Sequence, residues 1–217
     1  MRGLIEKDLR LLFKRKQIFA VIIFVEIMLG ISGSGNFAVV YFTMLAGIIA
    51  AGTLSYDEFD NGLEFLFTLP IDRKTYIRGK YVLCAAFCAV AWLISIGLYA
   101  ITEMISGHNA DIIAELPLLF IILPSMSMMS TVILPLQLKF GSEKGKVALF
   151  VICGCLAAAI VLIKNMFFDT EEAMLSLVYG LQGISMGAVI LGFTAVCILV
   201  VLITYSLSVK IMQNKEL

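Results

Sequence analysis

The sequence is poor in charged residues and almost lacks histidine. Only 15% of its 217 residues are Asp, Glu, Lys or Arg, against about a quarter in soluble domains, and 61% are hydrophobic. The one histidine, His108, gives the five cysteines no partners for a zinc or redox site. All five cysteines lie inside apolar runs, which argues against disulfides in exposed loops. This composition indicates a membrane protein rather than a soluble or disulfide-stabilised domain.

Six apolar runs are long enough to be considered as membrane spans. A bilayer core about 30 Å thick needs roughly 20 residues of helix. The six runs are Gln17–Asn36, Phe37–Leu54, Tyr81–Thr102, Leu116–Leu138, Val147–Ile163 and Ile184–Val209. We expect Ala173–Gly183 to be re-entrant or interfacial, because another crossing would place the basic C-terminus outside. Three prolines in the fourth run, Pro117, Pro124 and Pro135, predict a bent or broken helix there.

Basic residues alternate between the two sides of these runs. Fifteen of the sixteen Lys and Arg residues fall at the N-terminus, in the second and fourth connections and at the C-terminus. They are Arg2, Lys7, Arg10, Lys14, Arg15 and Lys16; Arg73, Lys74, Arg78 and Lys80; Lys139, Lys144 and Lys146; and Lys210 and Lys215. Basic residues stay on the cytoplasmic side of a membrane. The pattern therefore predicts one multi-pass membrane domain over residues 1–217, in the cell membrane, with both termini cytoplasmic.

The basic N-terminal segment has the spacing of a helix that lies on the membrane. Its apolar residues recur at helical intervals opposite a basic face: Ile5, Leu9, Leu12 and Phe13 against Lys7, Arg10 and Lys14. Such a helix suits the cytoplasmic lipid surface. We therefore expect residues 1–16 to form an interfacial helix of the mature protein. The alternative is a charge cluster that only sets the topology and needs no helix.

The second connection, residues 55–80, is cytoplasmic in this topology and unusually apolar. An acidic run, Asp57-Glu58-Phe59-Asp60, precedes Gly62, and the apolar cluster Leu63–Leu69 follows. After Leu69-Pro70, Asp72 is placed to cap a basic helix that leads into the third run. An exposed apolar helix needs a covering surface. The candidates are the membrane surface, the other spans of this chain, or a cytoplasmic partner.

This connection resembles the first cytoplasmic loop of permeases in the type-2 ABC exporter family. The positions that match are Glu58, Gly62, Glu64, Leu69, Pro70, Asp72, Arg73 and Lys80, and Lys7-Asp8-Leu9 near the start agrees with it. The resemblance implies that a short helix, with Leu66 and Phe67 on it, docks into a groove on a separate ATPase and transmits its movement. Small members of the family, which this chain resembles most, include exporters of cationic amphipathic peptides such as phenol-soluble modulins.

The chain itself lacks an ATPase site. Its nearest approach to a phosphate-binding loop, Gly141–Val147, has three residues between the glycines instead of four, and Val147 replaces the required Ser or Thr. Within the family resemblance, ATP and Mg²⁺ are therefore expected on a partner chain, with no cofactor held here. No nucleic-acid partner is expected.

Glu26 is the one charged residue inside the first run. A charge at the bilayer centre costs about 2.5–3.5 kcal/mol on insertion scales, so such residues usually face the bundle or a wet cavity. Glu26 could line a pathway and attract a cationic substrate. It could equally hydrogen-bond a neighbouring helix or lie near an interface.

The sequence thus predicts an all-α membrane protein of six transmembrane helices, with an N-terminal interfacial helix and a cytoplasmic coupling helix between spans two and three. The function expected from the resemblance is the permease subunit of an ABC exporter of amphipathic or cationic peptides, paired with a second copy or a paralogue. An ATP-independent carrier or an immunity-type membrane protein is the alternative. An intramembrane enzyme would need convergent His, Asp or Ser groups, and the spans offer one acid and no histidine.

Overall fold

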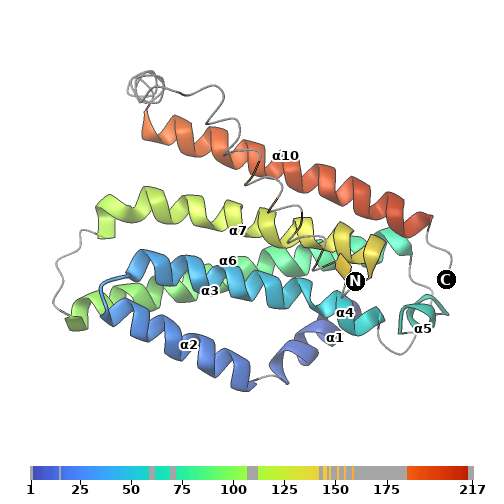
Figure 1. Cartoon of the computed structure of the whole chain (residues 1–217), viewed down its shortest axis with the longest axis horizontal. Helices are drawn as coiled ribbons and strands as arrows, with labels where there is room; N and C mark the ends of the chain where they lie inside the picture. Colours follow the sequence, from blue (N-terminus) through green and yellow to red (C-terminus); the bar gives the residue numbers. More distant parts are fainter. Residues whose placement is uncertain are drawn as a thin grey trace.

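The fold is helical throughout the part of the chain that can be placed. The computed structural model describes residues 2–14, 16–58, 62–68, 72–106, 112–141 and 185–214, with a few single positions between 144 and 158, and no strand occurs among them. The helices are α1 (Arg2–Phe13), α2 (Lys16–Ile31), α3 (Gly35–Ala51), α4 (Thr53–Glu58), α5 (Gly62–Thr68), α6 (Arg73–Ser106), α7 (Ile112–Phe140) and α10 (Met186–Gln213) (Figure 1). The predicted all-α class is confirmed for these residues.

Four helical stretches are long and apolar enough to cross a bilayer. They are Gly35–Glu58, Arg73–Ser106, Glu115–Phe140 and Gly187–Gln213, which correspond to the second, third, fourth and sixth predicted runs. Helix α2 covers most of the first run, but its 16 residues span about 24 Å, less than a bilayer core. The fifth run, Val147–Ile163, and Ala173–Gly183 lie largely or wholly outside the described residues. A multi-pass membrane protein is supported, and six crossings stay a prediction.

The long helices pack side by side, with α3 and α6 in the middle. Helix α3 contacts α2, α6 and α7, and α10 packs mainly on α7, so that α10 and α2 lie on opposite sides of the bundle (Figure 1). Much of α10 is apolar and exposed, as with Leu191, which is 71% exposed. Apolar side chains facing outward are what a lipid environment favours, because lipid tails are as apolar as a protein core.

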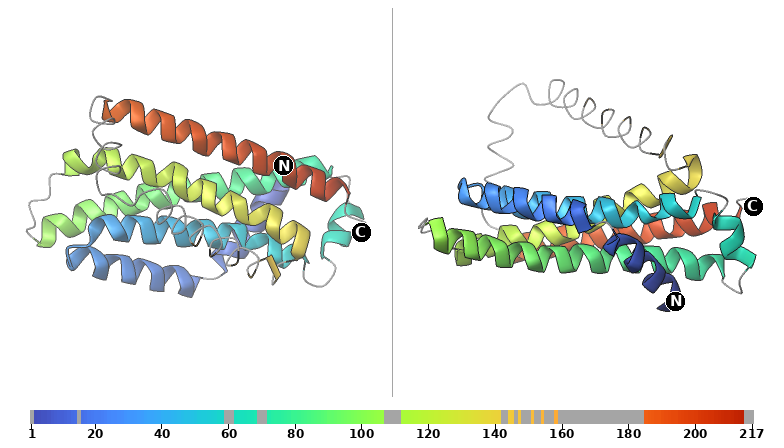
Figure 2. Two further views of the ribbon diagram at one scale, coloured as in Figure 1. Left: turned by 45° about the horizontal axis from the view of Figure 1, so that its top comes forward. Right: turned by 90° about the horizontal axis from the view of Figure 1, so that it is seen from below.

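The two ends of the bundle differ in character. At one end, Ser32 and Gly33 turn the chain from α2 into α3, with Gly33 in the left-handed region at φ 80°, where glycine carries no steric cost. At the other end lie α1, α4, α5 and the end of α10, with α1 oblique to the long helices (Figure 2). The start and the end of the described chain therefore lie toward the same end, as the alternation of basic residues requires.

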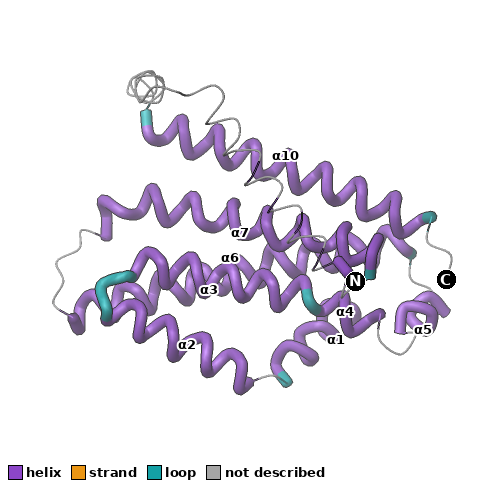
Figure 3. The backbone as a smooth tube through the Cα atoms, in the orientation of Figure 1, coloured by secondary structure: helices purple, strands orange, loops and turns teal. Residues whose placement is uncertain are grey.

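Two helices differ from the sequence prediction. Helix α6 has 34 residues, about 51 Å, and so includes the basic segment before the predicted third run. Helix α7 runs unbroken through its three prolines (Figure 3), so of the bent or broken helix expected there the break is ruled out and the bend stays a prediction. Neighbouring helices can satisfy a carbonyl that a proline leaves without its helical donor. Pro135 does this to the Thr131 carbonyl, to which the Tyr81 hydroxyl on α6 donates at 3.4 Å.

Candidate functional site

Helix α5 is a short amphipathic element held against one end of the bundle. Leu63 is 5% exposed and belongs to the core cluster there, and Leu66 and Phe67 pack partly buried against the same cluster. Phe65 points the other way and is 71% exposed, beside the exposed Glu64. The apolar residues of the second connection thus divide into a face that binds this chain's own helices and one aromatic ring that does not.

Aromatic and basic side chains fasten α5 to the helices beside it. The rings of Phe67 and Tyr76 meet edge to face, with centroids 5.8 Å apart, and the Arg73 guanidinium carbon lies 5.8 Å from the Phe67 ring centroid. Arg73 Nη1 also donates to the carbonyls of Met212, at 3.0 Å, and Gln213, at 2.8 Å. A cation is favourable at a helix C-terminus because the last carbonyls lack helical donors. Arg73 therefore joins α5, α6 and the end of α10.

Behind α5, four charged side chains form a cluster that we call the α1–α6 charge cluster: the buried Asp8, Asp57 and Lys80, and Lys7, whose side chain is 36% exposed. Lys80 is 2% exposed, and its ammonium lies 2.7 Å from Asp8 Oδ2 and 2.8 Å from Asp57 Oδ2. Lys7 pairs with Asp57 and lies 3.5 Å from Asp8 Oδ1. Two cations and two carboxylates balance, so burial leaves no net charge.

Neutral hydroxyl groups add hydrogen bonds to this cluster, while Asp8 Oδ1 has no hydrogen-bond partner among the described residues. Lys80 Nζ donates to Thr53 Oγ1 at 3.2 Å, and the hydroxyl of the fully buried Tyr76 donates to Asp57 Oδ2 at 2.8 Å. The groups come from α1, α4 and α6, so the cluster fixes three helices of one bundle end to one another. Removing one member of a buried ion pair costs about 3–5 kcal/mol, because the partner charge is left uncompensated.

Sequence reasoning missed Asp8, Asp57 and Tyr76 as members of a site. A signal was present for Asp8, which falls at four-residue spacing between Leu4 and Leu12. Leu4, Asp8 and Leu12 are all buried on the face of α1 that contacts the bundle. A single acid on an otherwise apolar helix face needs a partner, and a lysine elsewhere in the chain is the natural one. The stripe expected to face lipid is therefore divided, because Leu12 is 3% exposed and contacts the bundle whereas Phe13 is 62% exposed.

The predicted coupling residues differ in how accessible they are to a partner. Asp72 and Glu64 are exposed, and Glu58 is half-buried at the end of α4. Lys80 lies in the α1–α6 charge cluster instead of on a surface a partner could reach. Leu69 and Pro70 lie outside the described residues. Helix α6 begins at Arg73, directly after Asp72, as the capping pattern predicted.

Glu26 faces the bundle. It is 2% exposed, and the Ser95 hydroxyl on α6 donates to its Oε1. Its second oxygen, Oε2, is buried without a hydrogen-bond partner among the described residues. The contact is the interhelical hydrogen bond that the sequence left open as one alternative, and a role in a substrate pathway stays a prediction.

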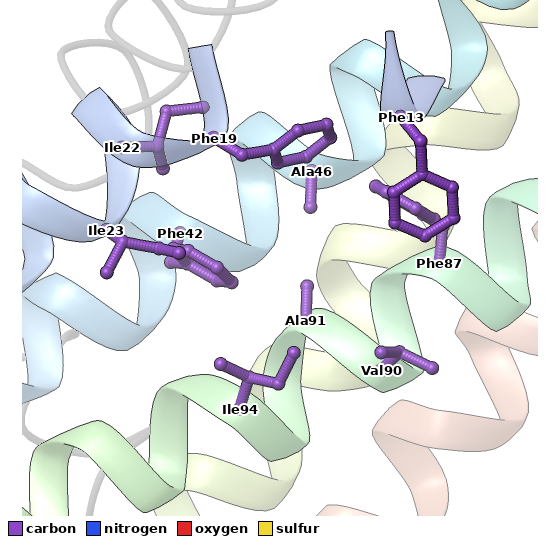
Figure 4. Close-up of a pocket in the computed structure, with 10 residues that line it drawn as sticks. All are labelled: Phe13, Phe19, Ile22, Ile23, Phe42, Ala46, Phe87, Val90, Ala91 and Ile94. Atoms are coloured by element: carbon purple, nitrogen blue, oxygen red, sulfur yellow. The ribbon is translucent and has the colours of Figure 1, made fainter. Parts of the chain in front are cut away.

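An apolar pocket of about 280 Å³ lies close to the junction of α1 and α2. It is lined by Phe13, Phe19, Ile22, Ile23, Phe42, Ala46, Phe87, Val90, Ala91 and Ile94 (Figure 4). These residues come from α1, α2, α3 and α6, and none offers a polar side-chain atom. The pocket can accept hydrocarbon only, and it carries no group that could do chemistry.

The residues that can be placed offer no metal-binding group either. Among them no group of three or more His, Cys, Asp or Glu side chains converges. Cys84, Cys88 and Cys197 are free and buried. The candidate site therefore consists of a helix with an exposed aromatic ring, fastened to a bundle end that holds a set of ion pairs.

Comparison with known proteins agrees with this description. A family model described as ABC-2 family transporter protein matches residues 3–213, nearly the whole chain. No curated protein and no solved structure matches the chain significantly. The match covers the long apolar helices as well as α5 and the α1–α6 charge cluster. The chain therefore belongs to the ABC-2 family of transporter proteins, as a multi-pass membrane permease.

Proposed function

We propose that this permease is the membrane half of an ABC exporter whose ATP is hydrolysed on a separate subunit. Membership of the ABC-2 family supports an ATPase partner and a dimeric assembly. The lack of a phosphate-binding loop in the sequence agrees with this division of labour. Two copies of this chain, or one copy and a paralogue, would enclose the pathway, with membrane lipid around them.

The observation that carries the proposal is the exposure of Phe65 on a helix that is otherwise anchored. A large aromatic ring that is 71% exposed at a bundle end is available for burial in a partner. Aromatic side chains that enter pockets dominate the energetics of many interfaces. Its neighbours Leu63 and Phe67 hold α5 on the bundle, so a force on Phe65 would reach the permease instead of being lost in a mobile loop.

The contacts behind α5 suggest how movement would pass into the membrane helices. Phe67 contacts Tyr76 and Arg73 on α6, and Tyr76 bonds Asp57 of α4. Lys80, one turn further along α6, pairs with Asp57 of α4 and with Asp8 of α1, and so links these three helices. ATP-driven closure of the ATPases would move α5 together with the first turns of α6. Cargo can bias such a switch only by binding its two states with different affinity.

The cargo we propose is an amphipathic or cationic peptide. This rests on the resemblance to small peptide exporters and on the acidic residues in or near the spans, of which Glu26 is the deepest in its run. The alternative remains a carrier or immunity-type protein that works without ATP. It differs in one respect that can be measured, because it would need no partner on α5.

Co-purification tests the proposal. The permease is expressed with its candidate ABC ATPase, and Phe65→Ala is compared with Phe24→Ala, which removes an equally large ring that is 63% exposed on α2. We expect the first variant to lose most of the bound ATPase and the peptide efflux, and the second to keep both. Equal ATPase recovery and efflux in the two variants would favour the ATP-independent alternative.

A further inference from the structure

A second pocket, lined in part by polar residues, lies at the end of the bundle opposite α5. It has a volume of about 360 Å³ and is lined by Gly33, Ser34, Gly35, Asn36, Phe37, Tyr99, Glu103 and Glu115. The lining residues come from the α2–α3 turn and from the facing ends of α6 and α7. Two of the eight are acids and none is basic. In the predicted topology this end faces the outside of the cell.

One acid of this outer pocket has no cation paired with it among the residues that can be placed. Glu103 is 6% exposed, and its Oε2 has no hydrogen-bond partner among the described residues. A buried carboxylate without a partner is costly, and groups of this kind usually call for an explanation. Glu115 differs, since its Oε2 accepts a hydrogen bond from the Tyr99 hydroxyl. The pocket thus holds one satisfied acid and one acid with an oxygen to spare.

The wall of the pocket is fixed by a close approach between helices. A Cβ atom at Gly35 would lie 2.0 Å from Cε2 of the Tyr99 ring, so only glycine leaves room for the ring in this position. Tyr99 is 4% exposed and belongs to the core cluster of this end. The ring and its hydroxyl are therefore held in place from both sides, and Glu115 is positioned through them.

We propose that the outer pocket binds an alkylammonium group, such as a lysine side chain or the amino terminus of a peptide. An ammonium would supply hydrogen-bond donors and a countercharge for Glu103, and the Tyr99 and Phe37 rings beside it are of the kind that attracts organic cations. A Ca²⁺ ion takes six to eight oxygen ligands and Mg²⁺ needs octahedral ones. Two carboxylates, one of them engaged by Tyr99, suit a single organic cation better.

The ammonium binding proposed here rests on the proposed function, because the ammonium would belong to an exported peptide. It concerns binding only, and binding at this end needs no ATPase. A failure here would leave the α5 proposal intact. A failure of α5 to capture an ATPase would equally leave the pocket open to test.

The test is a binding titration on the full-length permease in nanodiscs of zwitterionic lipid. The probe is a fluorescent amphipathic peptide rich in lysine, compared with the same peptide after lysine acetylation, with empty nanodiscs subtracted. We expect Glu103→Gln to raise the Kd of the lysine peptide at least about tenfold, and to leave weak binding of the acetylated peptide unchanged. Glu6→Gln, an exposed acid at the opposite end, is the matched control and should have no effect.

A second readout separates binding from folding. Replacing an unpaired buried carboxylate by a neutral amide removes a source of instability, so Glu103→Gln should raise the thermal midpoint of the peptide-free protein while it weakens binding. The proposal is overturned if the native protein binds both peptides equally, or if Glu103→Gln leaves the Kd of the lysine peptide unchanged. Displacement of the peptide by millimolar Ca²⁺ or Mg²⁺, at matched ionic strength, would overturn it in favour of a metal site.

Discussion

Substitution of Lys80 by methionine tests the α1–α6 charge cluster most strongly. Methionine keeps the length and apolar stem of the side chain but removes the ammonium that lies 2.7 Å from Asp8 and 2.8 Å from Asp57. Lys7 remains as the single cation for two carboxylates that are 2% and 4% exposed. One carboxylate is left uncompensated, and we expect a loss of about 3–5 kcal/mol in the free energy of unfolding.

Three of the five cysteines, Cys84, Cys88 and Cys197, are free and buried, and they provide the assay once Cys153 and Cys155 have been replaced by serine. A thiol-reactive dye that fluoresces on labelling reports their exposure as the purified protein is heated. In a chain of this size, the predicted loss corresponds to a midpoint lowered on the order of 10 °C. The matched control is Arg78→Met, an exposed cation on the same helix, which should lower the midpoint by no more than about 2 °C.

A double variant shows whether the loss in Lys80→Met comes from the unbalanced charge or from altered packing. Asp8→Asn combined with Lys80→Met removes one charge of each sign and leaves Lys7 with Asp57. We expect the double variant to regain at least half of the midpoint lost by Lys80→Met, which is a coupling typical of directly interacting residues. If Lys80→Met behaved like the Arg78→Met control, or if Asp8→Asn added its own full loss, the buried cluster would not be what holds α1 to α4 and α6.

Three further predictions concern the remaining sites. Leu63→Ala should lower the thermal midpoint, because it empties a core position that is 5% exposed. Phe65→Ala should leave the midpoint unchanged and affect only partner binding, and a lower midpoint in both variants would mean that Phe65 packs on this chain. Glu26→Gln keeps an acceptor for Ser95, so we expect normal stability and reduced efflux of lysine-rich peptides, and intact efflux would remove Glu26 from the pathway. Gly35→Ala should displace the Tyr99 ring and weaken binding of the lysine peptide, and an unchanged Kd would show that the ring position does not matter to the pocket.

Long apolar runs predict membrane helices well because one property, length without charge, decides them. The runs Phe37–Leu54, Tyr81–Thr102, Leu116–Leu138 and Ile184–Val209 each lie within or largely within a long helix of the structure. Helix ends were less predictable, and α6 begins eight residues before its run, at Arg73. Basic residues end an apolar run but not a helix, since Lys and Arg are good helix formers.

The second connection shows where a single sequence becomes insufficient. Its apolar content predicted that it must be covered, but not that Leu63 and Phe67 would be covered by this chain while Phe65 would not. That division depends on how α5 is oriented against α6 and α10, which no local pattern encodes. The charged residues follow the same rule, because Lys80 and Asp57 are 23 positions apart in the chain and meet only in the folded bundle.

Site-specific photo-crosslinking tests the central claim, that α5 receives a separate ATPase. The photoreactive amino acid p-benzoylphenylalanine replaces Phe65 in one variant and Phe37 in another; both native rings are well exposed, at 71% and 60%, and they lie at opposite ends of the bundle. After irradiation of intact membranes, the account predicts a covalent adduct between position 65 and a protein that carries a phosphate-binding loop, with no such adduct at position 37. Adducts at position 65 that contain only lipid or this chain itself would contradict it.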